Sequence, residues 1–74
     1  MDITLEQEKN HWVMILQETP LNKNQTWDSA VESVAVELKN RAGVKRMAYN
    51  HWHWDGRCEQ EAREYITYFL VKYL

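Results

Sequence analysis

The fold class depends most on residues 44–54, which read VKRMAYNHWHW. Helical spacing relates Val44, Met47, Ala48 and His51. The last four letters, residues 51–54, instead alternate as a half-buried strand does. We favour a short helix or turn at 44–52, with an extended conformation as the alternative.

The clearest amphipathic pattern in the chain precedes this stretch. Thr26 is a good helix cap, and Asp28 is placed to favour the positive end of a helix dipole. One side of the following helix would be apolar, with Trp27, Ala30, Val31, Val34, Ala35, Leu38 and Ala42. Gly43 then suits a left-handed C-cap. The pattern predicts a helix over 27–42.

The N-terminal residues carry a second helical signal. Thr4 and Gln7 fit a capping box, in which each side chain satisfies a free backbone amide of the first helical turn. Leu5, Trp12 and Leu16 fall in one sector at 100° per residue. Thr19 and Pro20 end the pattern, because proline disfavours helix in the residue before it. We expect a helix from about 5 to 18.

A third helix is expected at the C-terminal end. Asp55 and Gly56 form a turn, after which one stripe collects Cys58, Ala62, Tyr65, Ile66, Phe69 and Tyr73. This predicts a helix over 57–74. The fold class expected is therefore all-α, a small bundle of three main helices in a single domain, 1–74, with no internal repeat.

Charge is unevenly distributed along the chain. The formal net charge is −2, yet residues 38–57 are basic, with Lys39, Arg41, Lys45, Arg46 and Arg57 against Asp55. One cysteine and no apolar leader argue against a secreted, disulfide-bonded protein, so we expect a cytoplasmic protein. No apolar run is long enough for a membrane span, and we expect no membrane association.

Aromatic and arginine side chains form most binding hot spots, since they bury large areas at little entropic loss. The basic, aromatic middle of the chain is therefore the expected contact site for a protein partner. Its residues are Lys45, Arg46, Tyr49, His51, Trp52, His53, Trp54 and Arg57. The competing interpretation is that Trp52 and Trp54 simply fill the core of a small domain.

Self-association is expected through the C-terminal helix. Tyr68, Val71 and Leu74 fall off its apolar stripe, so the last turns are apolar nearly all round. A chain of 74 residues has little core to spare, and such residues suit a homodimer interface.

Nucleic-acid binding is the main alternative. With Gly43 as the turn residue, residues 38–54 partly resemble a helix-turn-helix, in which Lys45 and Arg46 would open the second helix. Lys39 stands where that pattern requires a small residue. The acidic first half of the chain also opposes phosphate binding.

Metal binding and catalysis are weaker alternatives. His11, His51, His53 and Cys58 could supply zinc ligands, but no paired cysteines occur. Cys58 near a helix start could be a nucleophile with a histidine base, but it lies on the apolar stripe, where an inert core cysteine belongs. We expect no enzyme, no catalytic residues, no metal and no cofactor.

The function expected is a non-enzymatic protein-protein interaction module, a stoichiometric regulator or inhibitor. Composition alone suggests this class, because small acidic, aromatic-rich chains without chemical motifs include inhibitors made by phages and other mobile elements.

Overall fold

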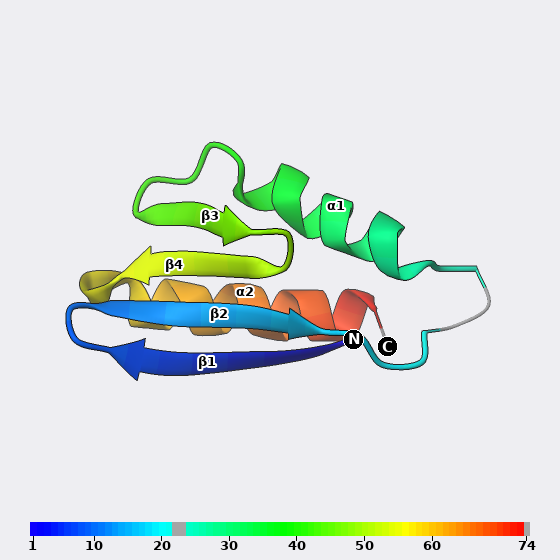
Figure 1. Cartoon of the computed structure of the whole chain (residues 1–74), viewed down its shortest axis with the longest axis horizontal. Coiled ribbons are helices and arrows are strands. Elements are labelled where there is room, and N and C mark those ends of the chain that lie inside the picture. The colour runs from blue at the N-terminus through cyan, green and yellow to red at the C-terminus, as the bar shows by residue number, and fades with distance from the viewer. Residues whose placement is uncertain (22–23, 74) are drawn as a thin grey trace.

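A computed structural model describes residues 1–21 and 24–73 of the chain. Over these residues the fold is α+β, with one antiparallel sheet and two α-helices (Figure 1). The strands are β1 (Asp2–Glu8), β2 (His11–Gln17), β3 (Val44–Ala48) and β4 (His51–Asp55), and the helices are α1 (Trp27–Leu38) and α2 (Glu59–Lys72). The sheet order is β1-β2-β4-β3. The predicted all-α bundle is therefore wrong.

The helix predicted over 5–18 is a β-hairpin. β1 and β2 pair from Asp2 opposite Gln17 to Glu8 opposite His11, and Lys9 in the intervening turn has a φ of 43°. The chain reverses between Leu5 and the apolar residues of β2, and this reversal places them on one face of the sheet. The same residues therefore satisfied a helical stripe without forming a helix.

The short helix predicted at 44–52 is a second hairpin, β3 and β4, so the extended alternative is correct for residues 51–54. The physical reason is burial. Alternation turns Trp52 and Trp54 to the same face, where they are 2% and 0% exposed. A helix would have separated the two indole rings by about 200°, leaving one of them in solvent.

The other two helices are confirmed, with changed ends. The N-cap Thr26 side chain accepts a hydrogen bond from the Ser29 amide at 3.2 Å, as a cap requires. α1 ends at Leu38 rather than at residue 42. A single 3-10 turn, η1 (Gly56–Cys58), leads into α2. Neither helix of the described chain is long and apolar enough to cross a bilayer.

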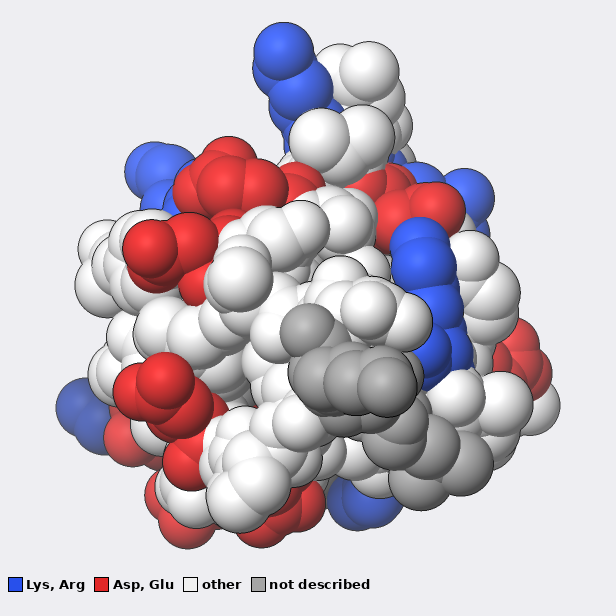
Figure 2. Space-filling view, turned by 90° about the vertical axis from the view of Figure 1, so that its right-hand side faces the viewer, with Lys and Arg blue, Asp and Glu red and all other residues white. Residues whose placement is uncertain are grey.

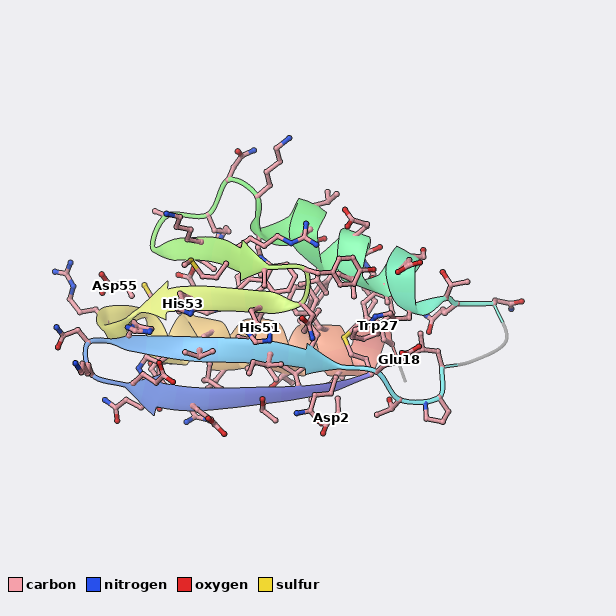
Figure 3. The ribbon with its side chains drawn as sticks, viewed as in Figure 1. Asp2, Glu18, Trp27, His51, His53 and Asp55 are labelled. Carbon is pink, nitrogen blue, oxygen red and sulfur yellow. The ribbon has the colours of Figure 1, made fainter. Side chains whose placement is uncertain are left out.

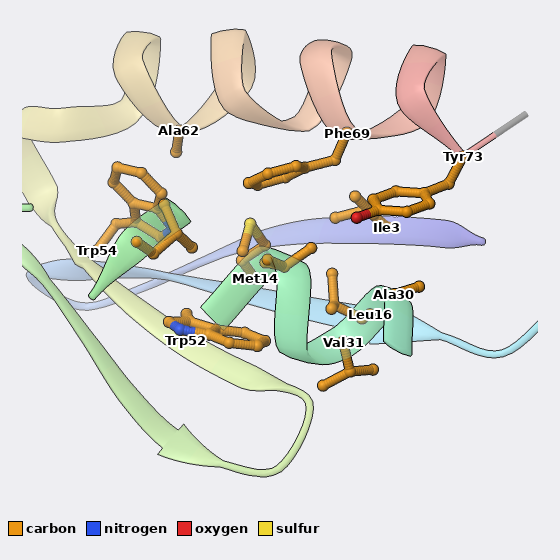
Figure 4. Close-up of a cluster of buried hydrophobic side chains, with 12 residues drawn as sticks. Ile3, Met14, Leu16, Ala30, Val31, Trp52, Trp54, Ala62, Phe69 and Tyr73 are labelled. Carbon is orange, nitrogen blue, oxygen red and sulfur yellow. The ribbon is translucent and has the colours of Figure 1, made fainter. Parts of the chain in front are cut away.

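Both helices contribute to one core against a single face of the sheet. α2 runs behind the sheet in Figure 1, and α1 lies beside the β3–β4 hairpin. Figure 4 shows the indoles of Trp52 and Trp54 packed between the strands and the helices. The buried residues of this core are Ile3, Met14, Leu16, Ala30, Val31, Val34, Leu38, Trp52, Trp54, Ala62, Phe69 and Tyr73. The opposite face of the sheet carries no helix among the described residues.

The two hairpins correspond to each other, although no internal repeat was expected. Each is followed by a helix, and the tripeptide Asn-His-Trp occurs at 10–12 and again at 50–52, across the turn into β2 and into β4. β2 and β4 pair antiparallel at the centre of the sheet, with Val13 opposite His53. The sheet therefore has approximate two-fold symmetry about the β2–β4 pair.

Candidate functional site

A groove of about 480 Å³ lies between α1 and the edge strand β3. Residues from three separate parts of the sequence line it: Glu32, Ala35, Val36, Leu38, Lys39, Val44, Lys45, Arg46 and Trp52. We call this the α1–β3 groove. It is the most promising site on the described chain because it combines an apolar floor, a charged rim and an exposed strand edge.

The floor of the groove is apolar. Trp52 projects from β4 toward the helices. Its side chain is 2% exposed, so only a small edge of the ring lines the groove. Leu38 at the end of α1 and Val44 at the start of β3 flank it. Val36 projects from α1 and is 73% exposed, so an apolar side chain is displayed where a partner could cover it.

Arg46 is held at the hairpin end of the groove by several contacts. Its Nε and Nη2 donate to the Tyr49 carbonyl at 3.2 and 2.7 Å, and Nη2 also donates to Glu32 Oε1 at 3.3 Å. The guanidinium lies 5.2 Å from the Trp52 ring centroid, a cation–π distance. Because these bonds fix the side chain, its charge is positioned before any ligand arrives.

The rim of the groove is basic. Lys39, Lys45 and Arg46 stand against Glu32, which Arg46 already pairs. Grooves of this composition attract carboxylates, because charge complementarity steers encounter and opposes cationic partners. Two basic residues of the predicted partner site, Lys45 and Arg46, thus line the groove.

β3 is an edge strand, and its residues Val44, Lys45 and Arg46 line the groove. It pairs with β4 on one side, and four of its five residues are exposed. The Asp55 amide donates to the Gly43 carbonyl at 2.7 Å, which fixes the alternation of the ladder. The backbone groups of Lys45 then point to β4, whereas those of Val44 and Arg46 point outward.

The predicted partner site is divided by the fold. Lys45, Arg46 and the edge of Trp52 lie in the groove. Tyr49 lies beside it at the hairpin turn, where its hydroxyl donates to Asp28 and its ring is 5.6 Å from the Arg46 guanidinium.

The remaining members of the predicted site lie elsewhere. Trp54 is fully buried, so it cannot contact a partner. His51 and His53 lie on the uncovered face of the sheet (Figure 3), and Arg57 lies at the corner after β4, bonded to Asp55. The sequence interpretation missed the α1 side of the groove. The exposed Val36, off the apolar stripe of α1, was the available signal.

The uncovered sheet face gathers all three histidines of the chain. Strand register places His11, His51 and His53 on this face, beside Val13 and Ile15. The His11 and His53 rings stack with centroids 4.5 Å apart. Carboxylates surround them, since Asp2, Glu6 and Glu8 alternate outward along β1 and Asp55 pairs with His11. The face is therefore acidic, unlike the groove.

A zinc site is not assembled from the residues considered for one. Cys58 packs against the core on the helix side of the sheet, whereas the histidines lie on the opposite face. Among residues 1–21 and 24–73, no three His, Cys, Asp or Glu side chains are grouped to hold a metal ion. The same separation prevents His51 or His53 from acting as a base for the Cys58 thiol.

The helix-turn-helix interpretation of residues 38–54 is wrong. The segment expected to form the second helix is instead the two strands β3 and β4. Charge agrees with this correction. Figure 2 shows Lys and Arg side chains on the end of the molecule in view as separate projections among acidic ones, without a continuous basic surface there. A nucleic-acid ligand requires such a surface.

The residues predicted for self-association are partly described. Tyr68 and Val71 are 47% and 65% exposed on α2, so both are accessible to a second copy. Leu74 lies outside the described residues. Homodimer formation through α2 stays a prediction.

Comparison of the chain with protein-family models, with curated proteins and with solved structures finds no match in any of the three. The function must therefore be inferred from the groove itself.

Proposed function

We propose that the protein is a non-enzymatic protein-protein interaction module that holds a segment of its partner in the α1–β3 groove. One observation carries this proposal: an apolar floor with a basic rim lies directly beside the exposed edge of β3. Ligand sites combine these features, with apolar surface supplying affinity and a few fixed polar groups supplying orientation.

A protein partner suits the charge of the molecule better than a nucleic acid does. The net charge is −2, the uncovered sheet face is acidic, and Glu32 neutralises part of the groove's own charge. Nucleic-acid affinity depends on neutralising several phosphates, which three cations in a single groove do poorly. A protein segment needs only one or two complementary charges.

The mode of action proposed is stoichiometric regulation, in which one molecule of the protein regulates one partner molecule for as long as the partner's segment stays bound in the groove. A cytosolic location goes with this proposal, and the support for it is the single cysteine, which leaves no disulfide within the chain. Binding rather than chemistry is supported by the groove lining, because Glu32, Lys39, Lys45 and Arg46 include no nucleophile with an adjacent base.

The proposal is tested with two matched substitutions, Val36→Asp and Val71→Asp. Both residues are exposed valines in the last turn of a helix, so both changes carry the same loss of apolar surface, propensity and dipole energy. Only Val36 lines the groove. Each surface change should alter stability by no more than about 0.5 kcal/mol beyond the dipole effect.

A photo-reactive amino acid at Lys39 should cross-link a defined cellular protein, and excess unlabelled chain should compete for it. Excess Val71→Asp chain should compete as well as the native chain, whereas Val36→Asp should compete at least about tenfold more weakly. A photo-reactive group at Gln60 on α2 serves as the positional control. Equal competition by the two variants, or cross-linking from Gln60 alone, would show that the groove is not the docking site.

A further inference from the structure

We infer that the occupant of the α1–β3 groove is an extended, acidic segment of the partner, which adds to the edge of β3 as a fifth strand. This inference rests on the proposed function and specifies its ligand. Three observations lead to it: the unpaired backbone of β3, the distribution of cations on both sides of that edge, and the apolar floor.

The backbone of β3 requires a strand rather than a helix. Val44 and Arg46 direct their N–H and C=O groups away from β4, as the bond from the Asp55 amide to the Gly43 carbonyl fixes. An extended peptide can bond to these groups, whereas a helix has already used its own backbone donors and acceptors. Strand addition is the binding mode that completes the backbone hydrogen bonding of this edge.

The added strand would be short. Register shifts between Arg46 and Ala48, where β3 departs from regular pairing. Bulges of this kind limit pairing at sheet edges. The regular part of the edge is therefore Val44–Arg46, and side-chain contacts must supply most of the specificity.

Cations stand on both faces of the edge. Arg46 pairs with Trp52 and so lies on the helix side, whereas Lys45 pairs with His53 and lies on the uncovered side. Successive residues of an added strand alternate between these faces. An acidic residue would therefore lie near a cation whichever face it occupies.

The helix side of the added strand would also be partly apolar. Val36 and Ala35 on α1 face β3 across the groove, with the Trp52 ring between them at its floor. An apolar side chain of the segment would cover Val36, which is otherwise 73% exposed. Acidic residues with an interposed apolar one are thus the expected sequence chemistry.

Arg46 has donor capacity left for a carboxylate. Its hydrogen bonds within the described chain use Nε and Nη2, so Nη1 has no partner among those residues. A guanidinium carries five N–H donors, and two of them are on this nitrogen. The existing bonds fix the orientation of the group, which reduces the entropy lost on binding.

The experiment selects binders from a library of random peptides held internally in a carrier protein, so that no free C-terminal carboxylate is offered. The full chain is the bait. Selected peptides should be enriched in Asp and Glu, should bind the Val71→Asp chain as tightly as the native chain, and should bind Val36→Asp about tenfold more weakly or worse.

Backbone pairing is measured by amide hydrogen exchange. Saturation with a selected peptide should slow exchange at the Val44 and Arg46 amides, while the Lys45 amide, already directed to β4, serves as an internal reference. Two versions of the peptide are then compared, one N-methylated at its odd-numbered amides and the other at its even-numbered amides. One version should lose binding and the other should keep it, because only alternate residues of a strand direct their backbone groups toward a given neighbour.

Three results would each overturn the inference: binders without an acidic excess, binders that are helical when bound, or unchanged exchange at Val44 and Arg46. The inference would also be overturned if every selected peptide bound Val36→Asp and Val71→Asp equally well. If the cellular partner still cross-links from Lys39, the proposed function stands and only strand addition is wrong. If that cross-linking fails as well, both are wrong.

Discussion

Replacing Asn50 with alanine should destabilise the protein, whereas the same change at Asn10 should not. The two asparagines occupy the same place in the two hairpins, directly before a His-Trp pair. Asn50 Nδ2 donates to the Leu16 carbonyl at 2.8 Å, and the Leu16 amide donates to the Asn50 carbonyl at 3.0 Å. The asparagine side chain thus extends the β2 ladder past the end of β4.

The size of the effect follows from the carbonyl that is left behind. Leu16 is fully buried, so loss of the Asn50 amide leaves its carbonyl without that partner. An unsatisfied buried acceptor costs about 1–3 kcal/mol. Asn10 is exposed, and its side chain makes no hydrogen bond within the described chain, so Asn10→Ala should change stability by about 0.5 kcal/mol or less.

Thermal and urea unfolding of the native chain and the two variants measure this difference. Each kcal/mol corresponds to about 4–8 °C in Tm for a domain of this size. Asn50→Ala should therefore unfold several degrees below Asn10→Ala, with an unchanged urea m-value. Equal stabilities of the two variants would refute the reasoning, since it would mean that the Leu16 carbonyl gains nothing from the Asn50 side chain.

Three further changes test other parts of the fold. Gly56→Ala would place a Cβ 2.5 Å from the Asn10 carbonyl oxygen, so urea unfolding should show a loss of about 1–3 kcal/mol, and an unchanged midpoint would contradict the tight approach. Trp54→Ala removes a fully buried indole and should cost about 3–5 kcal/mol in the same assay; a loss under about 1 kcal/mol would mean that the indole is not in the core. The hydrogen bond to Asp28 raises the pKa of Tyr49 from 10.0 to about 12, so its stabilising effect is complete below pH 10 and disappears as pH rises toward 12. The difference in Tm between the native chain and Tyr49→Phe should shrink over that range, and a constant difference would count against the bond.

The burial of Trp52 and Trp54 changes how the binding site must be tested. Alanine at either position is expected to destabilise the fold strongly, so a loss of binding could reflect lost stability rather than lost contact with a partner. Val36→Asp avoids this problem because its side chain is largely in solvent.

Sequence patterns predicted the helices well and the strands poorly. α1 and α2 each show one dense apolar stripe at helical spacing, and both are helices over about three turns or more. β1 and β2 were taken for one helix because Leu5, Trp12 and Leu16 also fit helical spacing. Short apolar segments of this kind satisfy both periods, and only their pairing distinguishes them.

The candidate site shows the same limit. The basic run and Trp52 could be found from composition, and both contribute to the groove. The α1 wall was missed, because a single apolar residue off the stripe, Val36, does not by itself indicate a groove. The role of Val36 depends on β3 lying beside that helix.

By itself, the sequence predicted the helices α1 and α2 and the region where positive charge accumulates. Only the tertiary structure decided that two hairpins meet through β2 and β4, that Trp52 and Trp54 face inward together, and that β3 is left at an edge beside α1. The physical reason is that helical hydrogen bonds close within a few residues, whereas a strand acquires its partners, its buried face and its free edge from segments elsewhere in the chain.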